Sequence, residues 1–178
     1  LQTSPQPDFQ TALDQAISLA EEAATSGAEF IATPEYCGGL KTEGASFAPP
    51  SAPEASHPVL NGLRTFAKDR SKFVLIGSVA IDGPDNKIFN RSFLIDEEGN
   101  IVSRYDKIHL FDINLSEQQS YRESATVRGG NEAAICPTPF AKIAQTVCYD
   151  LRFPNLYRKL SQSGAEILLV PAAFTKKT

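Results

Sequence analysis

Apolar and polar positions follow two different rhythms in the first half of the chain. Apolar residues recur every three or four positions across residues 9–26 and again across 59–67, which predicts two amphipathic helices. Each is followed by a short apolar run, residues 29–33 and 73–81, of the kind found in buried strands. This repeated helix–strand order favours an α/β fold.

Turn-forming residues divide the middle of the chain. Clusters rich in Asp, Gly, Pro and Asn at residues 82–86 and 96–100 separate three strand-like stretches, which are residues 73–81, 87–95 and 101–106. Three strands joined by such short turns predict an antiparallel meander.

The last third repeats the alternation of strands and helices. Residues 133–136 and 141–147 predict a hairpin, residues 155–163 a helix and residues 166–170 a strand. Cys148 therefore lies where a strand gives way to a turn and then to a helix. Ligands commonly bind at such strand ends in α/β sheets.

Two longer polar stretches, residues 38–56 and 105–130, predict loops. The second contains Lys107, His109 and Glu123 with no obvious packing role, and loops of this length are often functional.

Composition narrows the class of protein. The chain has 178 residues, 42% of them hydrophobic, with a net charge of -4, which suits a single domain over residues 1–178. An acidic chain without a Lys/Arg cluster argues against nucleic acid or an anionic membrane as partner, so we expect a small-molecule substrate. The apolar runs are too short to span a bilayer and no secretory signal opens the chain, which predicts a cytoplasmic protein.

Cysteine and histidine usage points away from metal sites. Cys37, Cys136 and Cys148 are an odd number at wide spacing, and the chain has only two histidines. We therefore expect neither a disulfide framework nor a bound metal. The chain also starts without Met and stops at Thr178 just after a predicted strand, so we expect the domain to be incomplete at both ends.

Three short motifs carry a family resemblance. They are Thr33–Tyr36 (TPEY), Tyr105–Asp112 (YDKIHLFD) and Val147–Pro154 (VCYDLRFP). In this order they resemble the Glu, Lys and Cys motifs of the nitrilase superfamily of carbon–nitrogen hydrolases. The string KIHLFD and Tyr121–Ser124 (YRES) look most like the Nit-type amidases, which include omega-amidases and deaminated glutathione amidases.

The resemblance implies a four-layer α-β-β-α sandwich, commonly paired as a homodimer. It also implies a hydrolase that cleaves the C–N bond of a small carboxylate-bearing amide, releases ammonia through a cysteine thioester and needs no cofactor. The absent flanking segments would include a strand before Leu1 and further elements after Thr178 in that family.

Amide hydrolysis needs a nucleophile, a proton carrier and oxyanion stabilisation. By resemblance, Cys148 is the nucleophile, Glu35 carries the proton, and Lys107 with the Tyr149 N–H binds the oxyanion. A free thiol has a pKa of about 8.5, so Cys148 needs a neighbouring base or cation. On residue type alone, Cys148 is more often a core thiol, and Glu35 and Lys107 are more often surface residues.

The remaining assignments concern the second glutamate and the substrate. Glu123 resembles the family's second glutamate, which hydrogen-bonds the lysine, although Glu117 and Glu132 flank the same loop. Arg152 is a candidate for binding a substrate carboxylate, since a guanidinium offers paired donors, but an ion pair with Asp150 or another buried carboxylate is equally compatible.

Aromatic residues beside the motifs are candidates for substrate contact. Tyr36 and Phe174, like Tyr149, stand next to predicted strand ends and would line a pocket there, although packing is the commoner role of such residues.

Three rival interpretations stay open. N-carbamoyl-amine hydrolases and true nitrilases share the same three motifs, and a catalytically silent member would act as a binding protein. His109 also suggests a Cys–His pair of the thiol-protease kind. The order Glu, Lys, Cys accounts for more residues than a Cys–His pair does, so we expect His109 to be a structural hydrogen-bonding partner.

Overall fold

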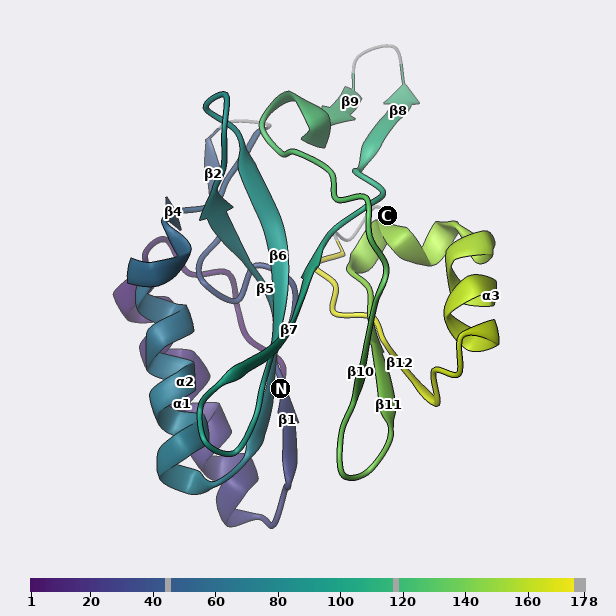
Figure 1. Cartoon of the computed structure of the whole chain (residues 1–178). Helices are drawn as coiled ribbons and strands as arrows, with labels where there is room; N and C mark the ends of the chain where they lie inside the picture. Colours follow the sequence, from purple (N-terminus) through teal and green to yellow (C-terminus); the bar gives the residue numbers. More distant parts are fainter. Residues whose placement is uncertain (44–45, 117–118, 175–178) are drawn as a thin grey trace.

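A computed structural model describes residues 1–43, 46–116 and 119–174 of the chain. Two helices, a sheet, a second sheet and a third helix lie on top of one another in that order (Figure 1). This is the α-β-β-α sandwich that the motifs implied, and the layering follows from helices that are apolar on one side only.

The helices begin where capping groups are available. In α1 (Phe9–Thr25), the Asp8 carboxylate accepts a hydrogen bond from the Thr11 N–H at 2.9 Å, and Ala residues form the buried side. In α2 (Pro58–Arg70), His57 Nδ1 accepts from the Leu60 N–H at 3.3 Å. Both helices cover the outer face of the first sheet (Figure 1).

The first sheet is the predicted meander with parallel strands added at one edge. β1 and β4 pair in parallel with β5, while β5, β6 and β7 pair antiparallel in that order. β5 is buried along nearly its whole length because helices cover one face and the second sheet covers the other. The strands are β1 (Phe30–Ala32), β4 (Ser51–Ala52), β5 (Phe73–Asp82), β6 (Ile88–Ile95) and β7 (Ile101–Asp106).

The second sheet contains the predicted hairpin and the last predicted strand. β10 (Ala134–Pro137) pairs antiparallel with β11 (Lys142–Gln145), and β11 pairs in parallel with β12 (Ile167–Leu169). α3 (Pro154–Gln162) lies on its outer side (Figure 1). Between the two sheets, Gln145 Nε2 donates a buried hydrogen bond to Ser92 Oγ at 2.9 Å.

The two predicted loops contain more structure than expected. Each holds an antiparallel strand pair and a single turn of 3-10 helix. Strand pairing depends on contact with neighbouring segments as well as on the strand propensity of the residues, so residues of weak propensity can still form strands. The additional elements are β2 (Lys41–Glu43), β3 (Ser46–Ala48), η1 (Glu54–Ser56), β8 (Asp112–Ser116), β9 (Gln119–Arg122) and η2 (Glu123–Ala125).

The largest apolar cluster lies between α1, α2 and the first sheet. A smaller one, including Leu75, Leu94 and Cys136, joins the two sheets. In the described part of the chain, the search for a helix with the length and hydropathy needed to cross a membrane finds none.

Candidate active site

Glu35 lies in the tight turn that follows β1. The turn is held by the bulge of β5, where Ser78 Oγ accepts a hydrogen bond from the Tyr36 N–H at 2.9 Å. A Cβ atom at Gly77 would lie 2.2 Å from the Thr33 carbonyl oxygen, so only glycine lets the two segments approach this closely. As a result Glu35 is 6% exposed and its carboxylate is directed into the protein.

Lys107 comes directly after β7 and reaches the same buried space. Its Nζ donates to Glu35 Oε1 at 3.0 Å and to Glu123 Oε2 at 2.9 Å. Its backbone is held by the Asn90 carbonyl on one side and the Gly130 N–H on the other, at 3.0 and 2.9 Å. The structure therefore brings three residues of separate sequence motifs into direct contact.

The charge of Lys107 is maintained by its two carboxylate partners. Burial alone would lower the pKa of this ammonium, since Lys107 is 2% exposed, but the negative charges of Glu35 and Glu123 outweigh burial and raise the pKa above its ordinary value. Lys107 is therefore a permanent cation at neutral pH, which suits a group that stabilises an oxyanion.

Glu123, at the start of η2, is the second glutamate of the cluster. Its Oε2 accepts the Phe111 N–H at 2.6 Å, and its Oε1 accepts the Tyr36 hydroxyl at 3.4 Å. Of the two alternatives, Glu132 is exposed and Glu117 lies outside the described residues. Among the described residues, Glu123 is the one of these glutamates that contacts Lys107.

Two further groups in this cluster were missed at the level of sequence. Asn90 is fully buried, and its Nδ2 donates to Glu35 Oε1 at 3.0 Å and to Glu123 Oε1 at 3.3 Å. The Ala173 N–H donates to Glu35 Oε2 at 2.9 Å. An Asn inside a predicted strand is unusual, so Asn90 had a usable signal. A backbone N–H, such as that of Ala173, gives no signal in the sequence.

Cys148 opens η3 (Cys148–Arg152) in a strained conformation. Its φ is 49°, in the left-handed region that favours glycine, and its N–H donates to the Pro171 carbonyl at 2.9 Å. Such strain is commonly found at functional sites. The sequence of strand, turn and helix resembles a nucleophile elbow without its glycines, as the predicted placement suggested.

The Cys148 thiol is protonated at rest. Burial raises its pKa, and the nearby Glu35 carboxylate raises it further, whereas the Lys107 ammonium lowers it; the net pKa is about 12. The Glu35 carboxylate, which acts on the pKa of this thiol, is held by Lys107 and by the Ala173 N–H. A base that could remove the thiol proton is therefore available beside it.

Tyr149 supplies a free backbone donor beside the thiol. Its N–H bonds to no acceptor in the ranges that the structure describes, although the N–H groups of Cys148 and Asp150 on either side are both satisfied. Its ring meets the rings of Phe111 and Phe153 edge to face, at 5.0 and 5.5 Å between centroids. An N–H without a described acceptor suits an oxyanion donor. The ring packs against Phe111, four residues after Lys107.

Three other candidates have different surroundings. Arg152 is exposed and pairs with no described carboxylate, so the ion pair with Asp150 is not formed. Phe174 is 54% exposed and lies next to Ala173, which contacts Glu35. His109 Nδ1 lies 2.7 Å from Asp150 Oδ1, which gives His109 the structural role expected and not that of a partner of Cys148.

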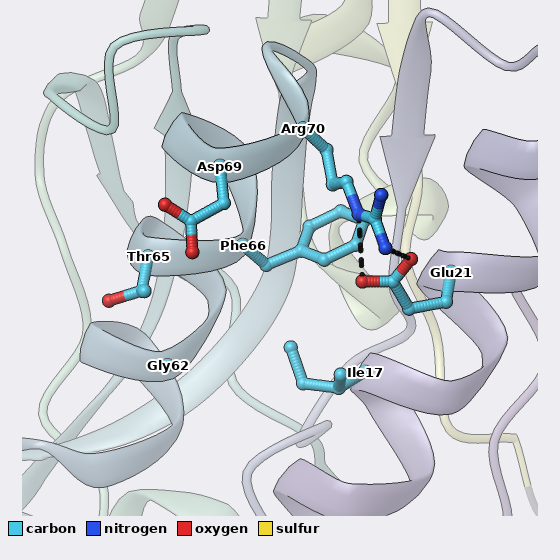
Figure 2. A pocket seen from close by; sticks show the side chains of 7 residues that line it. All are labelled: Ile17, Glu21, Gly62, Thr65, Phe66, Asp69 and Arg70. Carbon is cyan, nitrogen blue, oxygen red and sulfur yellow. Dashed lines mark hydrogen bonds and ion pairs between the residues drawn. The ribbon is translucent and has the colours of Figure 1, made fainter.

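No metal site is formed by the described residues, since no three of their His, Cys, Asp or Glu side chains are arranged to hold an ion. A hollow of about 430 Å³ lies elsewhere, between α1 and α2, beside the exposed ion pair of Arg70 and Glu21 (Figure 2). None of the predicted site residues lines it. Glu35, Lys107 and Cys148 instead follow the ends of β1, β7 and β11.

Comparison with known proteins identifies amidases as relatives of this chain. The chain is 38% identical over 157 residues to a deaminated glutathione amidase of Yersinia enterocolitica, covering 86% of this chain and 54% of that protein. It is 30% identical over 164 residues to the human omega-amidase NIT2, covering 92% of this chain and 58% of that protein. The chain thus spans a little over half the length of these two relatives.

Solved structures show the same fold. The NitFhit protein of Caenorhabditis elegans superposes with a TM-score of 0.84 at 23% identity, over 97% of this chain and 43% of that one. The family model described as carbon-nitrogen hydrolase matches residues 1–178. With Glu, Lys and Cys motifs in order and in contact, the chain belongs to the carbon-nitrogen hydrolase family.

Proposed function

We propose that this chain carries the catalytic centre of an amidase that hydrolyses a small carboxylate-bearing amide and releases ammonia. The observation that carries the proposal is the buried Lys107 ammonium between Glu35 and Glu123, beside the Cys148 thiol. Relatives named as amidases favour this reaction over hydrolysis of N-carbamoyl amines or nitriles. Retention of every catalytic group speaks against a silent binding protein.

The first half of the reaction forms a thioester. Glu35 takes the thiol proton while Cys148 Sγ attacks the amide carbon, and the resulting oxyanion lies between Lys107 Nζ and the Tyr149 N–H. Collapse of this intermediate breaks the C–N bond. Glu35 returns its proton to the departing nitrogen, which leaves as ammonia.

The second half restores the enzyme. Water attacks the thioester carbon while Glu35 accepts one of its protons, and the carboxylic acid leaves as the C–S bond breaks. The proton then returns from Glu35 to the thiolate. Glu123 and Asn90 hold Lys107 and Glu35 in place through both halves, since each contacts at least one of them. Tyr149, Tyr36, Phe174 and Arg152 are the candidates for substrate contact.

The test is ammonia release by the full-length protein from alpha-ketoglutaramate, deaminated glutathione, an N-carbamoyl amino acid and a simple nitrile. Cys148→Ala should abolish turnover, and Cys136→Ala, which removes a thiol from the cluster between the sheets, should retain it. Turnover that survives Cys148→Ala would disprove the mechanism. Release from the carbamoyl compound or the nitrile alone would assign the other branch.

The homodimer implied by the family resemblance and the cytoplasmic location indicated by the sequence both stay predictions. A homodimer should sediment at twice the mass of the full-length chain. A cytoplasmic location should place the protein with cytosolic markers after fractionation.

A further inference from the structure

Asp150 is a fully buried carboxylate two residues after Cys148, and its two oxygens accept four hydrogen bonds. Oδ1 accepts from the His109 N–H at 3.0 Å and lies 2.7 Å from His109 Nδ1, which must donate because a carboxylate only accepts. Oδ2 accepts from the Tyr105 hydroxyl at 2.7 Å and from the Val147 N–H at 2.9 Å.

These partners belong to the two segments that carry the reacting groups. Tyr105 and His109 lie two residues before and two residues after Lys107, and Val147 directly precedes Cys148. One carboxylate therefore joins the lysine segment to the cysteine turn. Nothing in the sequence separation predicts this, since Asp150 is 45 residues from Tyr105 and 41 from His109.

Both segments are also held on their other sides. The Tyr105 hydroxyl accepts the Ile108 N–H at 3.3 Å, and the His109 ring stacks on Phe153 with centroids 3.7 Å apart and planes 12° apart. Phe153 follows η3, so the stack again links the lysine segment to the cysteine turn. The lysine segment and the cysteine turn are thus joined twice, by the hydrogen bonds to Asp150 and by the stack of His109 on Phe153.

The cysteine turn needs such support. Cys148 has φ 49°, and a strained backbone of this kind persists only where the surroundings determine it. Its N–H is held by Pro171, while the bond from Val147 to Asp150 fixes the residue before it. Since a misplacement of about 1 Å can reduce a rate about 100-fold, the distance between thiol and ammonium has to be set closely.

We propose that Asp150 is a positioning residue, which fixes the Cys148 thiol relative to the Lys107 ammonium by joining the two segments. The inference rests on the proposed function, because the distance matters only if both groups act on one substrate. Asp150 itself contacts neither the thiol nor the ammonium among the hydrogen bonds of the described residues.

The test uses the full-length protein with Asp150→Asn, which keeps the volume but turns an amide N–H toward groups that are themselves donors. We expect kcat to fall roughly 100-fold while KM changes less than about twofold. The reason is that a misplaced thiol weakens the interactions of the transition state and leaves the binding of substrate nearly unchanged. Circular dichroism and a thermal melt establish that the variant is folded at the assay temperature.

Tyr105→Phe is the milder second variant, which deletes one of the four hydrogen bonds and should lower kcat by a smaller factor. Its matched control is Tyr157→Phe, which removes a phenol that bonds to Thr146 on the cysteine side only, and should leave kcat within about twofold. Equal losses in Tyr105→Phe and Tyr157→Phe, or a wild-type kcat in Asp150→Asn, would overturn the proposal.

A readout without turnover separates this proposal from the proposed function. Glu35 raises the pKa of Cys148 and Lys107 lowers it, so a thiol that has moved relative to these two groups should react with iodoacetamide at a different rate at a fixed pH near 9. Asp150→Asn should therefore change the alkylation rate, and Tyr157→Phe should not. An unchanged rate in Asp150→Asn overturns the positioning role even if no amide proves to be a substrate.

Discussion

Two charge clusters occupy opposite sides of the same pair of strands. Neighbouring residues of a strand point to opposite faces, so β6 and the end of β7 send Asn90 and Lys107 inward but Arg91 and Asp106 outward. The inner cluster is the site around Lys107. In the outer one, Arg91 binds Asp106 at 2.6 Å and Glu54 at 2.9 Å.

The clusters differ in burial and hence in what their charges can do. Side chains of Lys107 and Glu35 are 3% and 4% exposed, while those of Arg104 and Glu54 in the outer cluster are 48% and 27% exposed. Water and salt screen the outer charges, and such pairs contribute about 1 kcal/mol or less. Buried charges interact strongly and must be balanced, so the same residue types suit the reactive centre that we propose.

Lys107→Met is the change with the largest expected effect. It leaves the carboxylates of Glu35 and Glu123 buried without their cation, which we expect to lower the free energy of unfolding by about 3–5 kcal/mol and to abolish turnover. Chemical denaturation and ammonia release measure the two effects. A loss of stability no greater than that of an exposed ion pair would mean that the inner cluster is solvated like the outer one.

Glu35→Gln separates turnover from thiol reactivity. Turnover should fall about 100- to 10,000-fold because the proton carrier is lost. The Glu35 charge raises the pKa of Cys148, so its removal should lower that pKa from about 12 and increase the thiolate fraction at any pH below it. Alkylation by iodoacetamide followed by mass spectrometry across pH would show this.

The control for that experiment is Glu132→Gln, an exposed glutamate that should change neither property. If alkylation of Cys148 slowed in Glu35→Gln, the carboxylate would be activating the resting thiol and not holding it protonated.

Gly77→Ala tests how far the inner cluster depends on backbone approach. The added methyl would lie 2.2 Å from the Thr33 carbonyl oxygen, so the turn that carries Glu35 has to move. We expect a stability loss of about 1–3 kcal/mol together with a lower kcat. Gly27→Ala is the control: φ is +92° there but nothing lies within 4 Å of the added atom, so stability falls without a change in kcat.

Glu54→Gln should have the smallest effect. It removes the carboxylate shared by Arg91 and Arg104 in the outer cluster, and we expect a loss of about 1 kcal/mol or less that shrinks in high salt, with turnover unchanged. Melting temperature at low and high salt checks this. A fall in turnover would show that the two faces of β6 are coupled.

The clusters also show what the sequence could and could not predict. The helices and main strands were predicted because hydrophobic periodicity reports burial directly, and the order of layers followed from the family resemblance. The hairpins β2–β3 and β8–β9 were not, since their residues are polar and their pairing depends on distant packing. Glu35, Lys107, Cys148 and Glu123 were chosen as candidates through motifs.

The supporting groups of the site were less accessible. Asn90 and Asp150 are ordinary polar residues whose roles depend on partners far away in sequence, and the contact of Glu35 with the Ala173 N–H is made by backbone alone. Gly77 is needed because the fold brings its backbone against the Thr33 carbonyl, and no sequence pattern predicts that contact. Motifs thus point to the candidate reacting groups, while the contacts that hold them require the structure.

The contact between Ala173 and Glu35 also bears on biosynthesis, because it joins residues 138 positions apart. A pairing this distant cannot form until nearly all of the described chain has left the ribosome. Until then the Glu35 carboxylate lacks one of its donors. We therefore expect the contacts around Glu35 to be completed only after both sheets of the described chain are in place.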